Sequence, residues 1–158
     1  MEKLIEKVDS YNLFNYLVPG ALIYAFFTNI LKFGSLEDIF IRVIVCYALG
    51  LVASRVGSII FEWISKKLGL IVHSDYQLYV SACERDKKIE LFVEIANMYR
   101  TIYAASIICF IASFIFEESN KYEIDLAAIR ISLVVLAILF FFSYRKQSNY
   151  INQRVNRC

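Results

Sequence analysis

The chain has 158 residues, of which 59% are apolar and 20% are charged, and its mean hydropathy is +0.54. This composition excludes an ordinary soluble domain, in which about 45–50% of the residues are apolar. Five glycines and one proline argue against a disordered, collagen-like or turn-rich β chain. The net charge of +2 is too small to indicate binding to nucleic acid. We therefore expect an all-α protein that does not bind nucleic acid directly.

Four apolar segments are separated by short polar stretches. They cover residues 13–33, 39–64, 101–116 and 124–144. A helix that crosses a bilayer needs about 20 mostly apolar residues. The third segment reaches this length if Tyr99 and Arg100 lie among the lipid headgroups, with the arginine snorkelling. A soluble bundle would need more charged residues to cover four such helices, so we predict about four transmembrane helices in one membrane domain, residues 1–158.

The basic residues are distributed unequally between the polar stretches. If both termini lie on one side of the membrane, 12 of the 17 Lys and Arg residues lie on that side, and Lys32 and Lys121 lie on the other. The remaining three fall within the apolar segments. Because cytoplasmic loops carry an excess of Lys and Arg, we predict that both termini and residues 65–100 are cytoplasmic.

The cytoplasmic region 65–100 contains a helix start signal. Ser74 and Gln77 have the spacing of a capping box, so a helix should begin near Asp75. From there to Phe116 the sequence has neither Gly nor Pro. The simplest prediction is one long third helix over residues 75–116 that extends into the cytoplasm.

The polar part of this predicted helix carries an apolar stripe, which needs a packing partner. The stripe consists of Tyr76, Tyr79, Val80, Cys83, Ile89, Phe92, Val93, Ala96 and Tyr99. Within the chain, the candidates are residues 68–72 and the C-terminal helix beyond Tyr144. Alternatively, the stripe packs on a neighbouring copy of the chain. The sequence leaves these options open, and it also leaves open whether Pro19 kinks the first span or ends an interfacial helix at Val18.

Small residues recur every four positions in the second apolar segment. Gly50, Ser54 and Ser58 form one series, and Ala53 and Gly57 form a parallel pair. Small residues at this spacing let helix backbones approach closely in a membrane. They mark either a subunit interface or packing within the same chain.

Four charged residues in the apolar segments are candidates for a pore lining or a buried ion pair. Arg55 and Glu62 lie two turns apart on one side of the second segment. An arginine in hydrocarbon is costly, so Arg55 should face protein or water. It either pairs with Glu62 or a neighbouring chain, or lines a water-filled cavity or pore. Arg42 and Arg130 lie near the far ends of their spans, where snorkelling accounts for both and Asp38 is one helical turn from Arg42.

The sequence offers little for catalysis or metal binding. His73 is the only histidine, and Cys46, Cys83, Cys109 and Cys158 are far apart. No zinc-binding spacing, phosphate-binding glycine loop or nucleophile with a neighbouring base is present. We therefore expect no enzymatic activity, no metal and no cofactor.

Three stretches, "YNLFNYLVPGALIYAFF", "SRVGSIIFEWISKKLG" and "NMYRTIY", resemble small bacterial inner-membrane proteins encoded beside anti-phage systems. The nearest class is that of the membrane accessory proteins of type VI CRISPR loci. The resemblance implies a multi-pass protein of the bacterial inner membrane whose partners are the lipid bilayer, other copies of itself and a cytosolic defence protein.

Some members of this class are proposed to act as oligomeric pores, so the resemblance implies a homo-oligomer that forms a pore or depolarises the membrane in antiviral defence. The class is also described as carrying a divergent ribonuclease pattern, an Arg followed four to six residues later by His. No Arg stands at that distance before His73, which argues against ribonuclease activity. The alternative is a non-conducting anchor that docks a cytosolic partner through the cytoplasmic helix.

Overall fold

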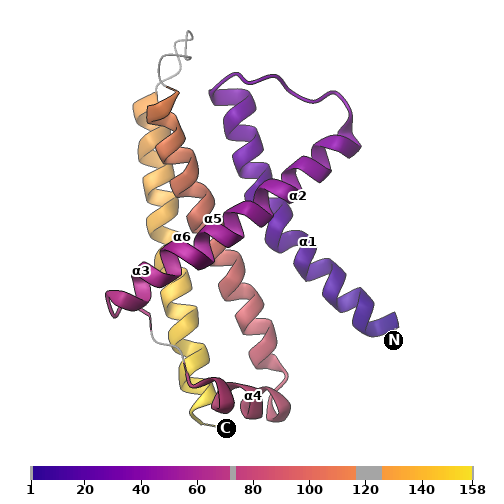
Figure 1. Ribbon diagram of the computed structural model, residues 1–158, viewed down its shortest axis with the longest axis vertical. Helices are drawn as coiled ribbons and strands as arrows, with labels where there is room; N and C mark the ends of the chain where they lie inside the picture. Colours follow the sequence, from indigo (N-terminus) through magenta and orange to yellow (C-terminus); the bar gives the residue numbers. More distant parts are fainter. Residues whose placement is uncertain (1, 72–73, 117–125, 158) are drawn as a thin grey trace.

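Figure 1 shows the computed structural model of the chain, which describes residues 2–71, 74–116 and 126–157, with side chains from residue 14 onward. Within these residues the secondary structure is entirely helical, which confirms the all-α prediction for this part of the chain. The helices are α1 (Glu2–Ala25), η1 (Phe26–Ile30), α2 (Ile39–Val56), η2 (Gly57–Phe61), α3 (Glu62–Lys67), α4 (Tyr76–Arg85), α5 (Lys88–Ile115) and α6 (Leu126–Val155). η1 and η2 are short π-helices.

Three helices in the described part of the chain are long and apolar enough to cross a membrane. They are the continuous helix Ile39–Lys67, made of α2, η2 and α3, and the helices α5 and α6. The apolar helix Phe14–Ile30 is shorter and does not meet this criterion. The lengths and composition therefore support a membrane protein with three candidate spans, and the fourth predicted span is not confirmed.

The helices form two crossed pairs. α5 and α6 run antiparallel side by side, and the helix Ile39–Lys67 crosses both α1 and this pair obliquely (Figure 1). A core joins α1, α2, α5 and α6 through Ile23, Ala53, Cys109 and Leu133. Both ends of the described chain and α4 lie toward one end of the molecule, and residues 31–38 lie at the other, an arrangement compatible with the predicted topology.

The prediction of one helix over residues 75–116 is wrong, because the chain leaves the helical conformation at Asp86. Asp86 is extended, with φ of −135° and ψ of 94°. Its carboxylate accepts hydrogen bonds from the backbone N–H of Lys88, at 3.1 Å, and from Nε of Arg154, at 2.5 Å. An aspartate that bonds to nearby backbone N–H groups competes with the helix. As a result, α4 folds across the ends of α5 and α6 instead of prolonging α5 (Figure 1).

The helix start near Asp75 is confirmed, but the predicted capping box is not used. The Asp75 carboxylate caps α4 by accepting the N–H of Gln77 at 2.8 Å. The hydroxyl of Ser74 instead donates to Oδ1 of Asn152 on α6, at 2.5 Å. The segment just before α4 is therefore attached to the C-terminal helix.

The apolar stripe finds its partners within the chain. One cluster joins Ala82 and Ile89 to Val155 of α6, and a second joins Ile71 and Ala96 to Tyr144. Both intramolecular candidates, the segment after α3 and the C-terminal helix, therefore pack against part of the stripe, whereas Tyr76 and Val80 remain exposed.

Candidate functional site

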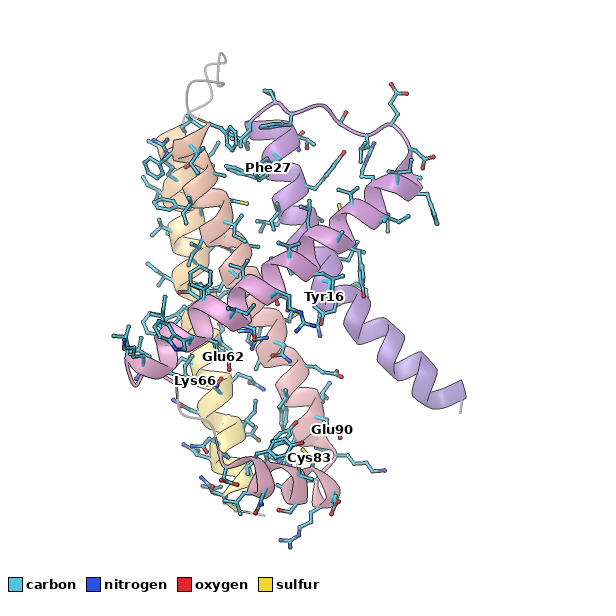
Figure 2. The ribbon with its side chains drawn as sticks, in the orientation of Figure 1. Tyr16, Phe27, Glu62, Lys66, Cys83 and Glu90 are labelled. Carbon is cyan, nitrogen blue, oxygen red and sulfur yellow. The ribbon has the colours of Figure 1, made fainter. Side chains whose placement is uncertain are left out.

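The small residues of the second apolar segment pack within the chain. Gly50 faces α1, where an added Cβ would lie 1.8 Å from the carbonyl oxygen of Tyr16 (Figure 2). On the other side of the crossing, a Cβ on Gly20 would lie 1.6 Å from the carbonyl oxygen of Cys46. The two backbones are in direct contact, so this crossing requires glycine on both helices. α1 also continues unbroken through the fully buried Pro19, so this residue does not end the helix at Val18.

Two other members of these series, Ala53 and Gly57, pack against α5. Ala53 is fully buried in the core, and a Cβ on Gly57 would lie 3.2 Å from Cβ of Ala104. Ser54 and Ser58 are half-buried. The parallel pair therefore seats the Ile39–Lys67 helix against α5.

The predicted ion pair between Arg55 and Glu62 does not form. Arg55 is exposed and makes no hydrogen bond or ion pair with the described residues. The π-helix η2, Gly57–Phe61, lies between the two side chains. A π-turn has more residues per turn than an α-helix, so it rotates Glu62 away from the face that carries Arg55.

Glu62 binds two other cations instead. One carboxylate oxygen accepts a hydrogen bond from Arg100 of α5, and the other lies 2.8 Å from Nζ of Lys66. Figure 2 labels Glu62 and Lys66. The side chains of Glu62 and Arg100 are each only 13% exposed. Nε of Arg100 is buried and has no hydrogen-bond partner among the described residues. Gly57 packs beside this contact, and a Cβ there would lie 3.4 Å from Cγ of Arg100.

Sequence reasoning missed Arg100 as a site residue because it placed this side chain among the headgroups. The signal that was available is Glu62 itself. A carboxylate within an apolar segment needs a cation, and Arg100 borders another such segment.

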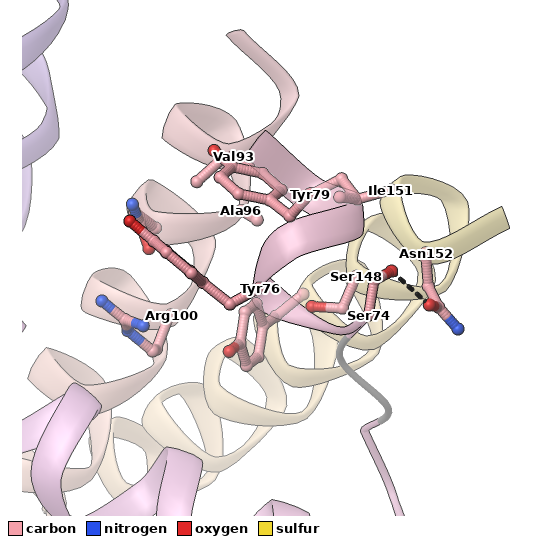
Figure 3. Close-up of a pocket in the computed structure, with 11 residues that line it drawn as sticks. Ser74, Tyr76, Tyr79, Val93, Ala96, Arg100, Ser148, Ile151 and Asn152 are labelled. Atoms are coloured by element: carbon pink, nitrogen blue, oxygen red, sulfur yellow. Dashed lines mark hydrogen bonds between the residues drawn. The ribbon is translucent and has the colours of Figure 1, made fainter. Parts of the chain in front are cut away.

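Arg100 also lines a cavity of about 320 Å³ between α4, α5 and α6, which we call the polar chamber (Figure 3). Its polar lining consists of Ser74, Tyr76, Tyr79, Asn97, Arg100, Tyr144, Ser148 and Asn152. Burial, together with a hydrogen bond to Cys83, raises the pKa of Tyr79 to about 12. This phenol is therefore neutral at pH 7 and adds no negative charge to the chamber.

Arg42 and Arg130 lie in other parts of the fold. Arg42 donates from Nε and Nη2 to the carbonyl oxygen of Leu36, in the connection before α2. Asp38 does not pair with it, because its carboxylate caps α2 by accepting two backbone N–H groups. Arg42 therefore fastens residues 31–38 to the start of α2.

Arg130 binds the last turn of α5. It donates to the carbonyl oxygen of Ser113 at 2.8 Å and to its hydroxyl at 3.1 Å. Its guanidinium lies 3.9 Å from the ring centroid of Phe114. A cation at a helix C-terminus satisfies carbonyl groups that lack helical partners. The structure therefore brings neither Arg42 nor Arg130 together with Arg55 or Glu62.

Within the described ranges, no three His, Cys, Asp or Glu side chains are close enough to hold a metal ion. His73 and Cys158 lie outside these ranges. Comparison with known proteins finds no matching family model, no similar curated protein and no similar solved structure.

Proposed function

We propose that this chain is a homo-oligomeric protein of the bacterial inner membrane that forms a pore or depolarises the membrane in antiviral defence. The observation that carries the proposal is the position of Arg55. It lies near the middle of the 29-residue helix Ile39–Lys67, is exposed, and has no polar partner among the described residues. An arginine at the centre of a span costs about 2.5–3.5 kcal/mol when it faces lipid. Water or a second chain beside Arg55 removes this cost.

The residues around Arg55 favour an interface between copies. Val52 and Ile59, one helical turn away on either side, are 59% and 70% exposed. An exposed apolar face that contains a single guanidinium is poorly suited to lipid. It is well suited to a subunit contact that encloses water around a ring of positive charge, as in channels. The antiviral setting rests on the resemblance of three sequence stretches to membrane proteins of anti-phage systems.

The test is cysteine cross-linking in native membranes, using a chain whose natural cysteines are changed to Ala. Val52→Cys places a thiol beside Arg55, and the proposal expects a ladder of cross-linked oligomers. Val135→Cys on α6 is the matched control, because it is similarly exposed on another helix. If both variants stay monomeric after cross-linking, or if both give equal ladders, the result would contradict a subunit interface on α2.

A second candidate function is a non-conducting anchor for a cytosolic protein. The cytoplasmic region that was expected to dock this partner packs partly against α6, but α4 exposes Tyr76, Leu78 and Val80. If the anchor is correct, Leu78→Asp abolishes function in a chain that remains monomeric. If the pore is correct, function follows oligomer formation and does not depend on this side chain.

A further inference from the structure

Two cavities lie end to end along the α5 and α6 pair. One is the polar chamber, and the other is an apolar groove of about 550 Å³ between α3, α5 and α6. On α5, the groove residues Tyr103 and Ile107 follow the chamber residue Arg100 by three and seven positions, which places all three on one helix face. On α6, the groove residue Phe141 precedes the chamber residue Tyr144 by three positions. The two cavities therefore lie next to each other on one face of the pair, and we call them together the path. The chamber end carries an arginine and several side-chain hydroxyl and amide groups, and the groove end is lined mainly by apolar side chains.

We propose that this path binds a membrane phospholipid with an anionic headgroup. The phosphate lies in the polar chamber beside Arg100, and an acyl chain lies in the apolar groove. Both volumes fall within the range of about 300–1,000 Å³ that is usual for small-molecule sites. This inference does not depend on the proposed pore, because a monomer contains the whole path.

Two side chains that line the chamber have polar groups without a hydrogen-bond partner among the described residues. Nε of Arg100 is buried without a partner among the described residues, and the Asn97 side chain, which also lines the chamber, makes no hydrogen bond with them. Glu62, Arg100 and Lys66 form a cluster with one negative and two positive side chains. The net charge of this cluster is therefore +1. A charge-assisted hydrogen bond from the guanidinium to a phosphate is roughly twice as strong as a neutral one. These features favour an acceptor with one negative charge.

The side chains on α3, near the place where the chamber and the groove meet, are those expected at the level of the lipid headgroups. Trp63 on α3 is 60% exposed, and Nζ of Lys67 lies 5.1 Å from the centroid of its ring. Trp and Lys side chains of this kind mark the interface between membrane and water. On the membrane side of this level, the groove is lined mainly by Ile, Leu, Val and Phe side chains. An occupant with a charged head and an apolar tail matches both ends, which a soluble anion does not.

The experiment measures lipid retention and thermal stability for the full chain in detergent, with dioleoyl phosphatidylglycerol as the probe. Dioleoyl phosphatidylcholine and inorganic phosphate are the comparison ligands. Native mass spectrometry should show the phosphatidylglycerol bound about tenfold more tightly than the phosphatidylcholine, which corresponds to about 1.4 kcal/mol. Binding to the folded state should also raise the Tm. Inorganic phosphate, which lacks a tail, should leave the Tm unchanged.

Two variants with matched controls test the two ends separately. Asn97→Leu removes a donor from the chamber, and Ala137→Phe fills the groove, so each should abolish the preference for phosphatidylglycerol. The controls Ser132→Leu and Val135→Phe change exposed positions on α6 that line neither cavity, and they should keep the preference. Equal retention of both lipids by the parent, a preference that survives in both site variants, or an equal Tm rise with inorganic phosphate would overturn the proposal.

Discussion

Glu62 and Arg100 join two candidate spans that cross obliquely, and both side chains are almost fully buried where they meet. Lys66 completes the arrangement on the same carboxylate. The contact fixes where the Ile39–Lys67 helix crosses α5. It also places the Arg100 side chain in the lining of the polar chamber.

Replacing Glu62 should destabilise the protein more than replacing Arg100. Glu62→Gln leaves Arg100 buried beside no anion, and we expect a loss of about 3 kcal/mol. Arg100→Gln should cost less, because Lys66 still neutralises Glu62. The double variant should lose less than the sum of the two, by about 0.5–3 kcal/mol. Thermal unfolding in detergent measures all three. Arg55→Gln is the control, and it should leave the Tm unchanged; strictly additive losses would show that the pair carries no coupling.

The crossing of α1 and α2 should not tolerate a single added methyl group. Gly50→Ala places a Cβ 1.8 Å from a backbone oxygen of Tyr16, and the helices must separate to accept it. We expect a loss of about 3 kcal/mol, at the upper end of the usual cost of overpacking. Gly34→Ala is the matched control, since nothing lies within 4 Å of its Cβ position. A Gly50→Ala protein as stable as Gly34→Ala would mean that α1 does not pack on α2 in the membrane.

Stability at low pH should depend on Asp86. The hydrogen bond from Arg154, followed by that from the Lys88 N–H, holds the pKa of this carboxyl below its ordinary value of 3.8. A lowered pKa means that the ionised form stabilises the fold above pH 3.8, and that this contribution is lost as the pH falls through the folded-state value. At pH 6, amide hydrogen exchange at residues 86–89 should be faster in Asp86→Asn than in the parent. The protection of these amides in the variant should be nearly independent of pH over the range in which the Asp86 carboxyl titrates in the parent. Glu84→Gln, at an exposed position nearby, should behave as the parent does.

The topology prediction is tested by thiol labelling of intact cells. In a chain without natural cysteines, Ser35→Cys should react with an impermeant reagent added outside, and Glu84→Cys should react only after the cells are opened. Both positions are exposed and lie toward opposite ends of the molecule. Labelling of Glu84→Cys from outside would reverse the assignment.

Much of the fold follows from patterns within single segments. Apolar length predicts the candidate spans that contain Arg55, Thr101 and Leu133, and the small residues around Gly50 predict a close helix contact. These features depend on neighbouring residues and on the thickness of the bilayer, so the sequence carries them directly. The lack of Gly and Pro between Asp75 and Phe116 was misleading, because Asp86 breaks the helix by hydrogen bonding.

The candidate site was harder to predict because its parts come from distant segments. Glu62 was assigned to Arg55 by an α-helical count, but the π-turn between them changes the face. Its actual partner, Arg100, is 38 residues away in the sequence. The polar chamber depends on α4 turning back, which itself depends on the contact between Asp86 and Arg154. Contacts of this kind arise only once the helices are placed relative to one another.

The most direct test of the proposed function is the conductance of the purified oligomer in planar bilayers. The account predicts discrete currents from the parent with a preference for anions, because each subunit contributes one Arg55 to the lining. Arg55→Gln should assemble as the parent does and lose this preference. Arg42→Gln should keep it, since Arg42 is bound to Leu36 at the end of its helix. Intact oligomers of the parent that carry no current would contradict the pore and leave the anchor as the better account.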